Sequence, residues 1–189
     1  MRRVVVSEFL TLDGVMEAPG GEFHPDGKGG WTMQLFSEEA GKFKFDELFA
    51  ADALLLGRVT YEHFAAAWPS MTDEAGFADR MNSLPKFVAS TTLHEPLEWN
   101  ATLLQGDLAE EVGKLKRGDG QDILVFGSGD LVHTLLQHDV IDEFRLMVFP
   151  VILGSGKRLF RDGIATSALQ LLETTTFSSG VTVLRYGAS

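Results

Sequence analysis

The sequence contains no cysteine in its 189 residues. This absence excludes structural disulfides, cysteine nucleophiles and zinc sites built from cysteine. Basic residues are also few, because 16 Lys and Arg stand against 27 Asp and Glu and give a net charge of −11. A field of this sign repels nucleic acids and anionic membranes, so we expect neither as a partner. An anionic ligand would need a local group of donors to overcome the field.

Long apolar runs are missing as well. The run within residues 1–12 is interrupted by Ser7 and Glu8 and is too short for a secretory signal. No segment approaches the roughly 20 apolar residues of a transmembrane helix. These features predict a cytoplasmic protein. Length, a hydrophobic content of 44% and the lack of internal repeats predict one domain over residues 1–189.

Apolar runs alternate with helix-like segments along most of the chain. Strands are expected at 4–10, 53–56, 86–90, 101–104, 123–126 and 143–149. Helices are expected from Ser37, over 59–67, over 72–82 with Thr72 as the cap, from Asp107, and around 131–136. The runs 169–177 and 181–186 predict a hairpin. This order predicts a mostly parallel sheet with helices on both faces and an antiparallel edge.

Two strand-to-helix junctions carry residues suited to an anion. One is the segment 54–61 with Gly57, Arg58 and Thr60, and the other is the segment 125–131 with Gly-Ser-Gly at 127–129. Ligands of open α/β sheets lie beyond the carboxyl ends of strands, where helix N-termini attract phosphate. Ser90 and Thr91 end a third strand and add hydroxyls. A Gly-Ser-Gly also occurs as a plain tight turn and Arg58 as a solvated helix residue, so these readings remain open.

The order of several motifs resembles a known superfamily. Leu12–Val15, the Gly-Arg-x-Thr-Tyr segment at 57–61, Lys86–Ser90 and the Gly-Ser-Gly occur in the order seen in dihydrofolate reductases. Asp52–Gly57, Asp142-Glu143 and Pro150–Gly154 look like the C-terminal reductase domain of bifunctional riboflavin-biosynthesis deaminase-reductases. The chain therefore resembles the stand-alone members of the dihydrofolate reductase-like superfamily, from about residue 2 to 186.

The resemblance implies a fold, a cofactor and an assembly. The fold would be a three-layer α/β/α arrangement around a mixed, mostly parallel sheet of about eight strands, with a C-terminal antiparallel hairpin. NADPH would lie across the sheet, and members commonly form homodimers. The residues implied to bind the cofactor are Leu12, Gly14, Val15, Gly57, Arg58, Thr60, Ser90, Thr91, Gly127, Ser128, Gly129, Asp130 and Leu131.

The chain also departs from the riboflavin enzymes. Without cysteine it lacks the zinc site of the deaminase partner, so it would be a reductase module alone. The basic cluster that grips the ribose phosphate is replaced by 45–49, and the glutamate before the Gly-Gly is Phe126. These departures argue against the riboflavin intermediate as substrate. Folate reductases carry a carboxylate on the first helix, and candidates for it here are Glu38, Glu39, Asp46 and Glu47.

The predicted function is an NADPH-dependent reductase that transfers a hydride to a small heterocyclic substrate, pteridine- or pyrimidine-like, or to a carbonyl substrate. Asp13 is the candidate proton donor, although Asp13-Gly14 also fits a simple turn. The glycine-rich segment 17–31 fits either a lid, with Phe23 or Trp31 covering an apolar ring, or a surface loop. The alternatives are dihydrofolate reductase proper and a non-catalytic dinucleotide-binding sensor or dimeric interaction module.

His24 in the segment 17–31 could titrate near neutral pH, and the other histidines show no metal-site spacing. Phe43, Phe45 and Phe49 are expected in the core rather than in a group that stacks on a ligand.

Overall fold

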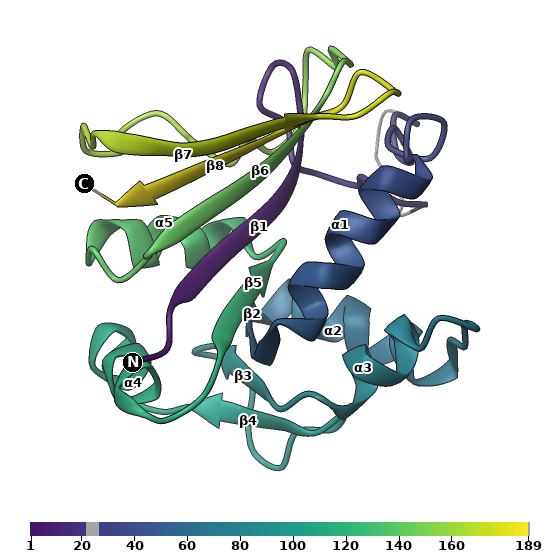
Figure 1. Ribbon diagram of the computed structural model, residues 1–189. Coiled ribbons are helices and arrows are strands. Elements are labelled where there is room, and N and C mark those ends of the chain that lie inside the picture. The colour runs from purple at the N-terminus through teal and green to yellow at the C-terminus, as the bar shows by residue number, and fades with distance from the viewer. Residues whose placement is uncertain (22–26, 189) are drawn as a thin grey trace.

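The computed structural model describes residues 1–21 and 27–188, and its helices and strands alternate as predicted (Figure 1). The strands are β1 (Val4–Thr11), β2 (Ala51–Gly57), β3 (Lys86–Ala89), β4 (Ala101–Leu104), β5 (Asp122–Phe126), β6 (Glu143–Phe149), β7 (Leu169–Thr176) and β8 (Thr182–Ala188). The helices are α1 (Glu38–Phe49), α2 (Arg58–Ala67), the short 3-10 turn η1 (Trp68–Ser70), α3 (Phe77–Ser83), α4 (Leu108–Arg117) and α5 (Gly129–Gln137).

All eight strands form one sheet in the order β4-β3-β2-β5-β1-β6-β8-β7. The six strands from β4 to β6 pair in parallel. The C-terminal hairpin then adds β8 and β7 in antiparallel pairing. The predicted mixed, mostly parallel sheet with a C-terminal antiparallel hairpin is therefore confirmed.

Helices cover both faces of the sheet, as Figure 1 shows, with α4 and α5 on one side and α1, α2 and α3 on the other. On the first face, Val4, Val6 and Leu55 pack with Val112 of α4 and Leu135 of α5. The second face is built from Val5, Leu54, Leu56, Leu48, Tyr61 and Met81. Two covered faces explain why β1, β2 and β5 read as continuous apolar runs rather than alternating ones. No helix in the described part of the chain is both long and apolar enough to cross a bilayer.

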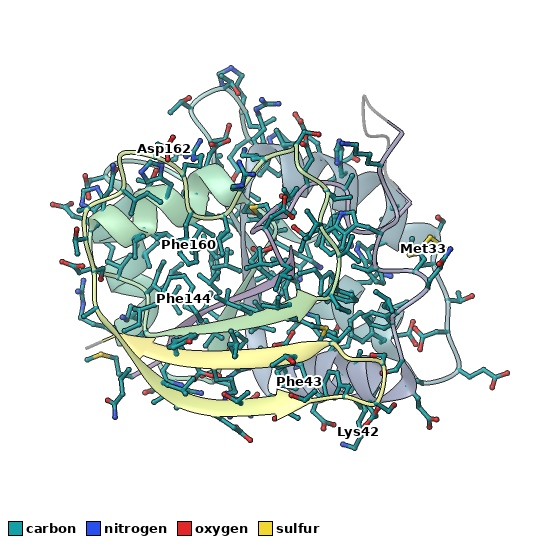
Figure 2. All side chains as sticks on the ribbon, turned by 90° about the horizontal axis from the view of Figure 1, so that it is seen from above. Met33, Lys42, Phe43, Phe144, Phe160 and Asp162 are labelled. Carbon is teal, nitrogen blue, oxygen red and sulfur yellow. The ribbon has the colours of Figure 1, made fainter. Side chains whose placement is uncertain are left out.

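The chain between β6 and β7 returns over the α5 side of the sheet. Phe160 in this connection packs edge-on against Phe144 of β6, with ring centroids 5.9 Å apart (Figure 2). Near the start of the connection, Lys157 and Arg161 form ion pairs with Asp130 at the beginning of α5. The connection thus brings basic side chains to the carboxyl end of the sheet.

Two local predictions were wrong. The helix expected over 72–82 begins only at Phe77, and Thr72 does not cap it. The Asp73 carboxylate accepts the N–H groups of Phe77 (3.0 Å) and Ala78 (2.6 Å), so it satisfies free amides of the first turn from outside the helix. Phe49 was expected in the core but is 42% exposed and stacks on Phe45. In its place α1 buries two charged residues, Lys44 and Glu47.

Candidate functional site

The two glycine turns lie side by side, because β2 and β5 are neighbours in the sheet and end at the same edge. The Gly57 N–H donates to the Ser128 hydroxyl oxygen at 2.9 Å. In return, the Ser128 N–H donates to the Thr60 hydroxyl oxygen at 2.9 Å. These reciprocal bonds join the two turns into one rigid unit.

Gly127 is the residue that this junction requires as glycine. Its φ is +55°, in the left-handed region that side chains disfavour. A Cβ added at Gly127 would lie 2.9 Å from the Thr60 hydroxyl oxygen. A larger residue would therefore push apart the atoms that connect the turns.

The helices that follow the turns begin without a side-chain cap. Neither Gly57, at the start of α2, nor Ser128, at the start of α5, offers a capping side-chain bond. By contrast, Ser37 and Asp107 cap α1 and α4 with their own side chains. The first-turn amides of α2 and α5 are thus available to an external acceptor. The positive end of each helix dipole would favour an anion in that role.

A cleft of about 1770 Å³ opens beside these helix ends. Arg58 and Lys157 bring positive charge to it, and Ala89, Leu104 and Leu108 give an apolar wall beyond β3. Of the residues predicted to bind the cofactor, those that line the cleft are Gly57, Arg58, Thr60, Ser90, Thr91, Gly127, Ser128, Gly129, Asp130 and Leu131. Leu12, Gly14 and Val15 are not among the described residues that line it.

Three charged side chains of the cleft, Arg58, Asp130 and Lys157, already have local partners. Arg58 forms an exposed ion pair with Glu62 at 2.8 Å, one helical turn on. Asp130 pairs with Lys157 at 2.6 Å and with Arg161 at 2.8 Å. The hydrogen bond from Lys157 is the main cause that lowers the pKa of Asp130. These exposed pairs are weak, so a phosphate can recruit the cations at little cost.

Ser90 stands at the far end of the cleft and is partly committed to its own loop. Its hydroxyl oxygen accepts the N–H groups of Thr92 (3.1 Å) and Leu93 (3.0 Å). Its hydroxyl hydrogen can still be donated to a ligand. Thr91 beside it is exposed.

Asp13 lies outside the cleft and is held in a turn. Its carboxylate accepts hydrogen bonds from the Thr11 hydroxyl (2.7 Å) and from the N–H groups of Leu153 (3.2 Å) and Gly154 (2.8 Å). These bonds, the Thr11 hydroxyl first, lower the pKa of Asp13 to about 2. A carboxyl group with that pKa carries no proton to donate near neutral pH. The simple-turn reading of Asp13-Gly14 therefore fits the structure, and proton donation by Asp13 does not.

Trp31 belongs to the core instead of covering a ligand. It is 9% exposed, its Nε1 donates to the Glu17 carbonyl at 2.9 Å, and its ring packs edge-on against Phe149. Phe23 and His24, the other residues considered in this segment, lie outside the described residues. Ala18 and Gly20, at the start of the segment, and Met16 just before it do line the cleft.

A buried polar group that the sequence analysis missed lies where α1 meets β1. The Lys44 ammonium donates to the Ser7 hydroxyl at 2.9 Å and forms an ion pair with Glu47. The Ser7 hydroxyl donates to Glu47 at 2.8 Å. Lys44 also lies over the Phe126 ring, 4.2 Å from its centroid. Ser7, Lys44 and Phe126 all line the cleft.

Glu8 is the second missed residue and the most unusual acid in the cleft. It is 5% exposed, and its Oε1 atom has no hydrogen-bond partner among the described residues. Burial raises the pKa of Glu8 well above its usual value, against the opposing effects of Lys44 and the Gly127 amide. The sequence signal for Ser7 and Glu8 was that they form a polar pair in a mostly apolar strand. A central strand tolerates polar side chains only where they have a role.

Comparison with known proteins identifies the family of this chain. The family model of the RibD C-terminal domain matches residues 2–183. The chain belongs to the RibD C-terminal domain family. Membership supports an oxidoreductase, a reductase of the riboflavin-pathway type, which agrees with the resemblance seen in the sequence.

Relatives of this RibD C-terminal domain extend over nearly its whole length. The uncharacterized protein YyaP of Bacillus subtilis strain 168 is 33% identical over 188 residues, which cover 98% of this chain and 94% of YyaP. A putative riboflavin biosynthesis protein from Shewanella sp. PV-4 shares the fold with a TM-score of 0.70 and 20% identity, covering 99% of both chains. Dihydrofolate reductase from Enterococcus faecalis, solved with NADP(H), shares the fold with a TM-score of 0.62 and 13% identity. The match covers 99% of this chain and 96% of the reductase chain.

Three of the four acids on α1 of this RibD C-terminal domain that were candidates for the pterin carboxylate have partners within the protein. Glu39 accepts from the Ser178 amide and hydroxyl, Asp46 pairs with Lys42, and Glu47 is bound to Lys44. Glu38 is exposed at the edge of the cleft. The buried acid in the cleft comes from β1 instead. Among the described residues, no group of three acids or histidines is placed to hold a metal ion.

The buried Glu8 predicts a pH-dependent stability. Glutamate ionises near pH 4.5 in the unfolded chain and at higher pH in the folded one, so the free energy of unfolding should fall as pH rises above that value. Glu8→Gln removes this titration. We therefore expect the variant to gain stability relative to the native protein between pH 5 and pH 8, measured by urea unfolding. A constant difference between native protein and Glu8→Gln over this range would contradict the pKa shift.

Proposed function

We propose that this protein is an NADPH-dependent reductase whose cofactor pyrophosphate binds between the Gly57 and Gly127 turns. The observation that carries the proposal is the convergence of two uncapped helix N-termini, α2 and α5, on one cleft. A pyrophosphate offers enough acceptor oxygens for both sets of amides. The tight glycine at 127 lets the backbone approach such a group closely.

Local charge supports the proposal in a protein of net charge −11. Arg58 stands at one side of the turns and Lys157 at the other, and both line the cleft. Arg58 is suited to the 2′-phosphate of NADPH because a guanidinium binds phosphate through two parallel hydrogen bonds. Ser90, Thr91 and the apolar wall of Leu104 and Leu108 would hold the adenosine.

The other end of the cleft is suited to a planar substrate. Aromatic rings from β1, the segment before α1, α1 itself and β5 line it: Phe9, Phe36, Phe45 and Phe126. Flat heterocycles stack on such rings. When bound, the reduced nicotinamide supplies the hydride, while this chain orients both molecules and excludes water. The substrate proposed is thus a small pteridine- or pyrimidine-like heterocycle or a related carbonyl compound.

The experiment that tests the proposal is calorimetric titration with NADPH and with NADH, followed by a substrate panel read at the nicotinamide absorbance. We expect saturable binding, tighter for NADPH, and oxidation of NADPH with at least one flat heterocycle. Absence of dinucleotide binding would contradict the proposal as a whole. Tight binding without turnover over the panel would instead favour the non-catalytic dinucleotide-binding protein.

Arg58→Ala should weaken NADPH binding about tenfold or more and NADH binding much less. The reason is that one charge-assisted contact to the 2′-phosphate is worth about 1.5–3 kcal/mol, and NADH lacks this group. Calorimetry on both cofactors measures the difference. Arg117→Ala removes an exposed arginine from α4 and serves as the matched control. An equal loss for NADPH and NADH in Arg58→Ala would remove the 2′-phosphate role from Arg58.

A further inference from the structure

Glu8 lacks a structural explanation within the described residues. It lies on β1, in the middle of the sheet, between Val6 and Leu10, which are buried on the same face of the strand. Among the described residues none donates a hydrogen bond to its Oε1 atom, although the side chain lines the cleft. A buried polar atom without a partner costs free energy, so proteins retain one where a ligand or a reaction uses it. This observation points to a ligand group that meets Glu8 in the cleft.

The charged groups around Glu8 leave the acid unpaired. Lys44 and Glu47, both from α1, are the charged residues that act on it, with opposite signs. Lys44 is already occupied by Glu47 and the Ser7 hydroxyl, so it forms no ion pair with Glu8. Among the described residues, the backbone amide of Gly127 favours a charge on Glu8. The environment therefore favours the neutral carboxylic acid and supports the carboxylate only in part.

Glu8 also stands between the two halves of the cleft. The Gly127 turn beside it belongs to the proposed cofactor end. Phe9, the next residue on β1, lies edge-on to Phe36 at the aromatic end. A flat substrate stacked among those rings would present its reacting bond to the strand that carries Glu8.

We propose that Glu8 is the catalytic acid of this protein and that its substrate presents an uncharged C=N or C=O bond to it. This inference rests on the proposed reductase function. As the hydride from the reduced nicotinamide forms the new C–H bond, the π bond breaks toward nitrogen or oxygen, and the Glu8 carboxyl proton forms the N–H or O–H bond. The substrate is reduced by two electrons and the nicotinamide is oxidised. Glu8 is left as a carboxylate, which Lys44 and the Gly127 amide stabilise until water in the open cleft returns a proton.

The same geometry defines the class of substrate. A protonated carboxyl group and an ammonium group both donate hydrogen bonds, so the reacting end of the substrate must accept them. A carboxylate or phosphate at that end would draw the Glu8 proton without reduction. The substrate is therefore neutral at its reacting end, as imine-bearing dihydropteridines are.

The first test measures the proton itself and needs no turnover. Protein labelled with ¹³C at the glutamate carboxyl carbon is followed by NMR from pH 5 to pH 8, and the resonance missing in Glu8→Gln is assigned to Glu8. We expect this resonance to remain that of a neutral acid well above pH 4.5, the ordinary value for glutamate. A Glu8 resonance that is ionised throughout this range would overturn the inference, whatever the result of NADPH calorimetry.

The second test measures the reaction with 7,8-dihydropterin and 7,8-dihydrofolate as probes, in single turnover with NADPH. Glu8→Gln should lower the hydride-transfer rate by roughly 10²- to 10⁴-fold, the usual contribution of a positioned acid, with the Kd for NADPH changed less than about threefold. Glu8→Asp should recover part of the rate. Glu110→Gln, which changes an exposed acid of α4 outside the cleft, should keep the native rate. The native rate should fall as pH rises through the range in which Glu8 loses its proton.

Three results would overturn the assignment of Glu8. They are a Glu8→Gln rate close to the native one, a native rate that does not fall with pH, and failure of the native protein to reduce either probe. Calorimetry separates these from failure of the proposed function, because NADPH binding would be intact in each case.

Discussion

Gly127→Ala should weaken NADPH binding by about a hundredfold. The substitution places a Cβ 2.9 Å from the Thr60 hydroxyl oxygen and strains a backbone at φ +55°. Relief of the contact breaks the Ser128-to-Thr60 bond and loosens the Gly57-to-Ser128 bond that join the turns. Two hydrogen bonds of about 1 kcal/mol each, with a strain of similar size, amount to about 3 kcal/mol, or roughly two factors of ten.

The matched control for this change is Gly163→Ala. Gly163 also has a left-handed backbone, at φ +85°, but no atom lies within 4 Å of the added Cβ. It therefore carries the same kind of backbone strain away from the cleft. Calorimetry should show native NADPH affinity for Gly163→Ala and a strong loss for Gly127→Ala, with circular dichroism confirming that both fold. Native affinity in Gly127→Ala would show that the junction of the turns does not hold the cofactor.

Lys44→Met should destabilise the protein by about 3–5 kcal/mol, the usual consequence of leaving one member of a buried ion pair alone. The side chains of Lys44 and Glu47 are only 10% and 3% exposed. Methionine fills a similar volume but leaves the Glu47 carboxylate with the Ser7 hydroxyl and the more distant Arg145, 3.6 Å away. The loss is therefore electrostatic and not a loss of packing.

A double-mutant cycle distinguishes these causes. Lys44→Met/Glu47→Leu removes both charges, so it should be clearly more stable than Lys44→Met alone. Urea unfolding at pH 7 gives the free energies. The exposed pair of Lys42 and Asp46, one turn apart on the same helix, is the control, and Lys42→Met should change stability by less than about 1 kcal/mol. A double variant no more stable than Lys44→Met would show that the charges are not coupled.

Much of the fold could be predicted because the pattern and the physics agree there. Fully apolar runs such as Val4–Val6 and Leu54–Leu56 mark strands covered on both faces, and the structure places them at the centre of the sheet. Ser37 and Asp107 cap their helices as expected, because a short side-chain oxygen ahead of a helix satisfies its free amides. The glycine turns at 57 and 127 could be placed at one end of the sheet because each follows a strand of a parallel pair.

The buried ion pair of Lys44 and Glu47 could not be predicted in the same way. The charge of Lys44 and Glu47 predicts exposure, although both lie on the same face of α1 as the buried Ala40 and Leu48. Their burial depends on Ser7 of β1 and Arg145 of β6, which approach α1 only in the folded chain. Likewise, Asp13 precedes a glycine and looked available, but the amides of Leu153 and Gly154, 140 and 141 residues away, hold its carboxylate.

The amide resonances of the two helix N-termini test the account most directly. In ¹⁵N-labelled protein titrated with NADP⁺, we predict saturable shifts that are largest at Arg58–Thr60 and at Gly129–Leu131. The last turn of α4, Lys114–Arg117, is not among the residues that line the cleft and should not move. Shifts centred on another surface, or none at cofactor concentrations that saturate calorimetry, would contradict a dinucleotide site between the turns.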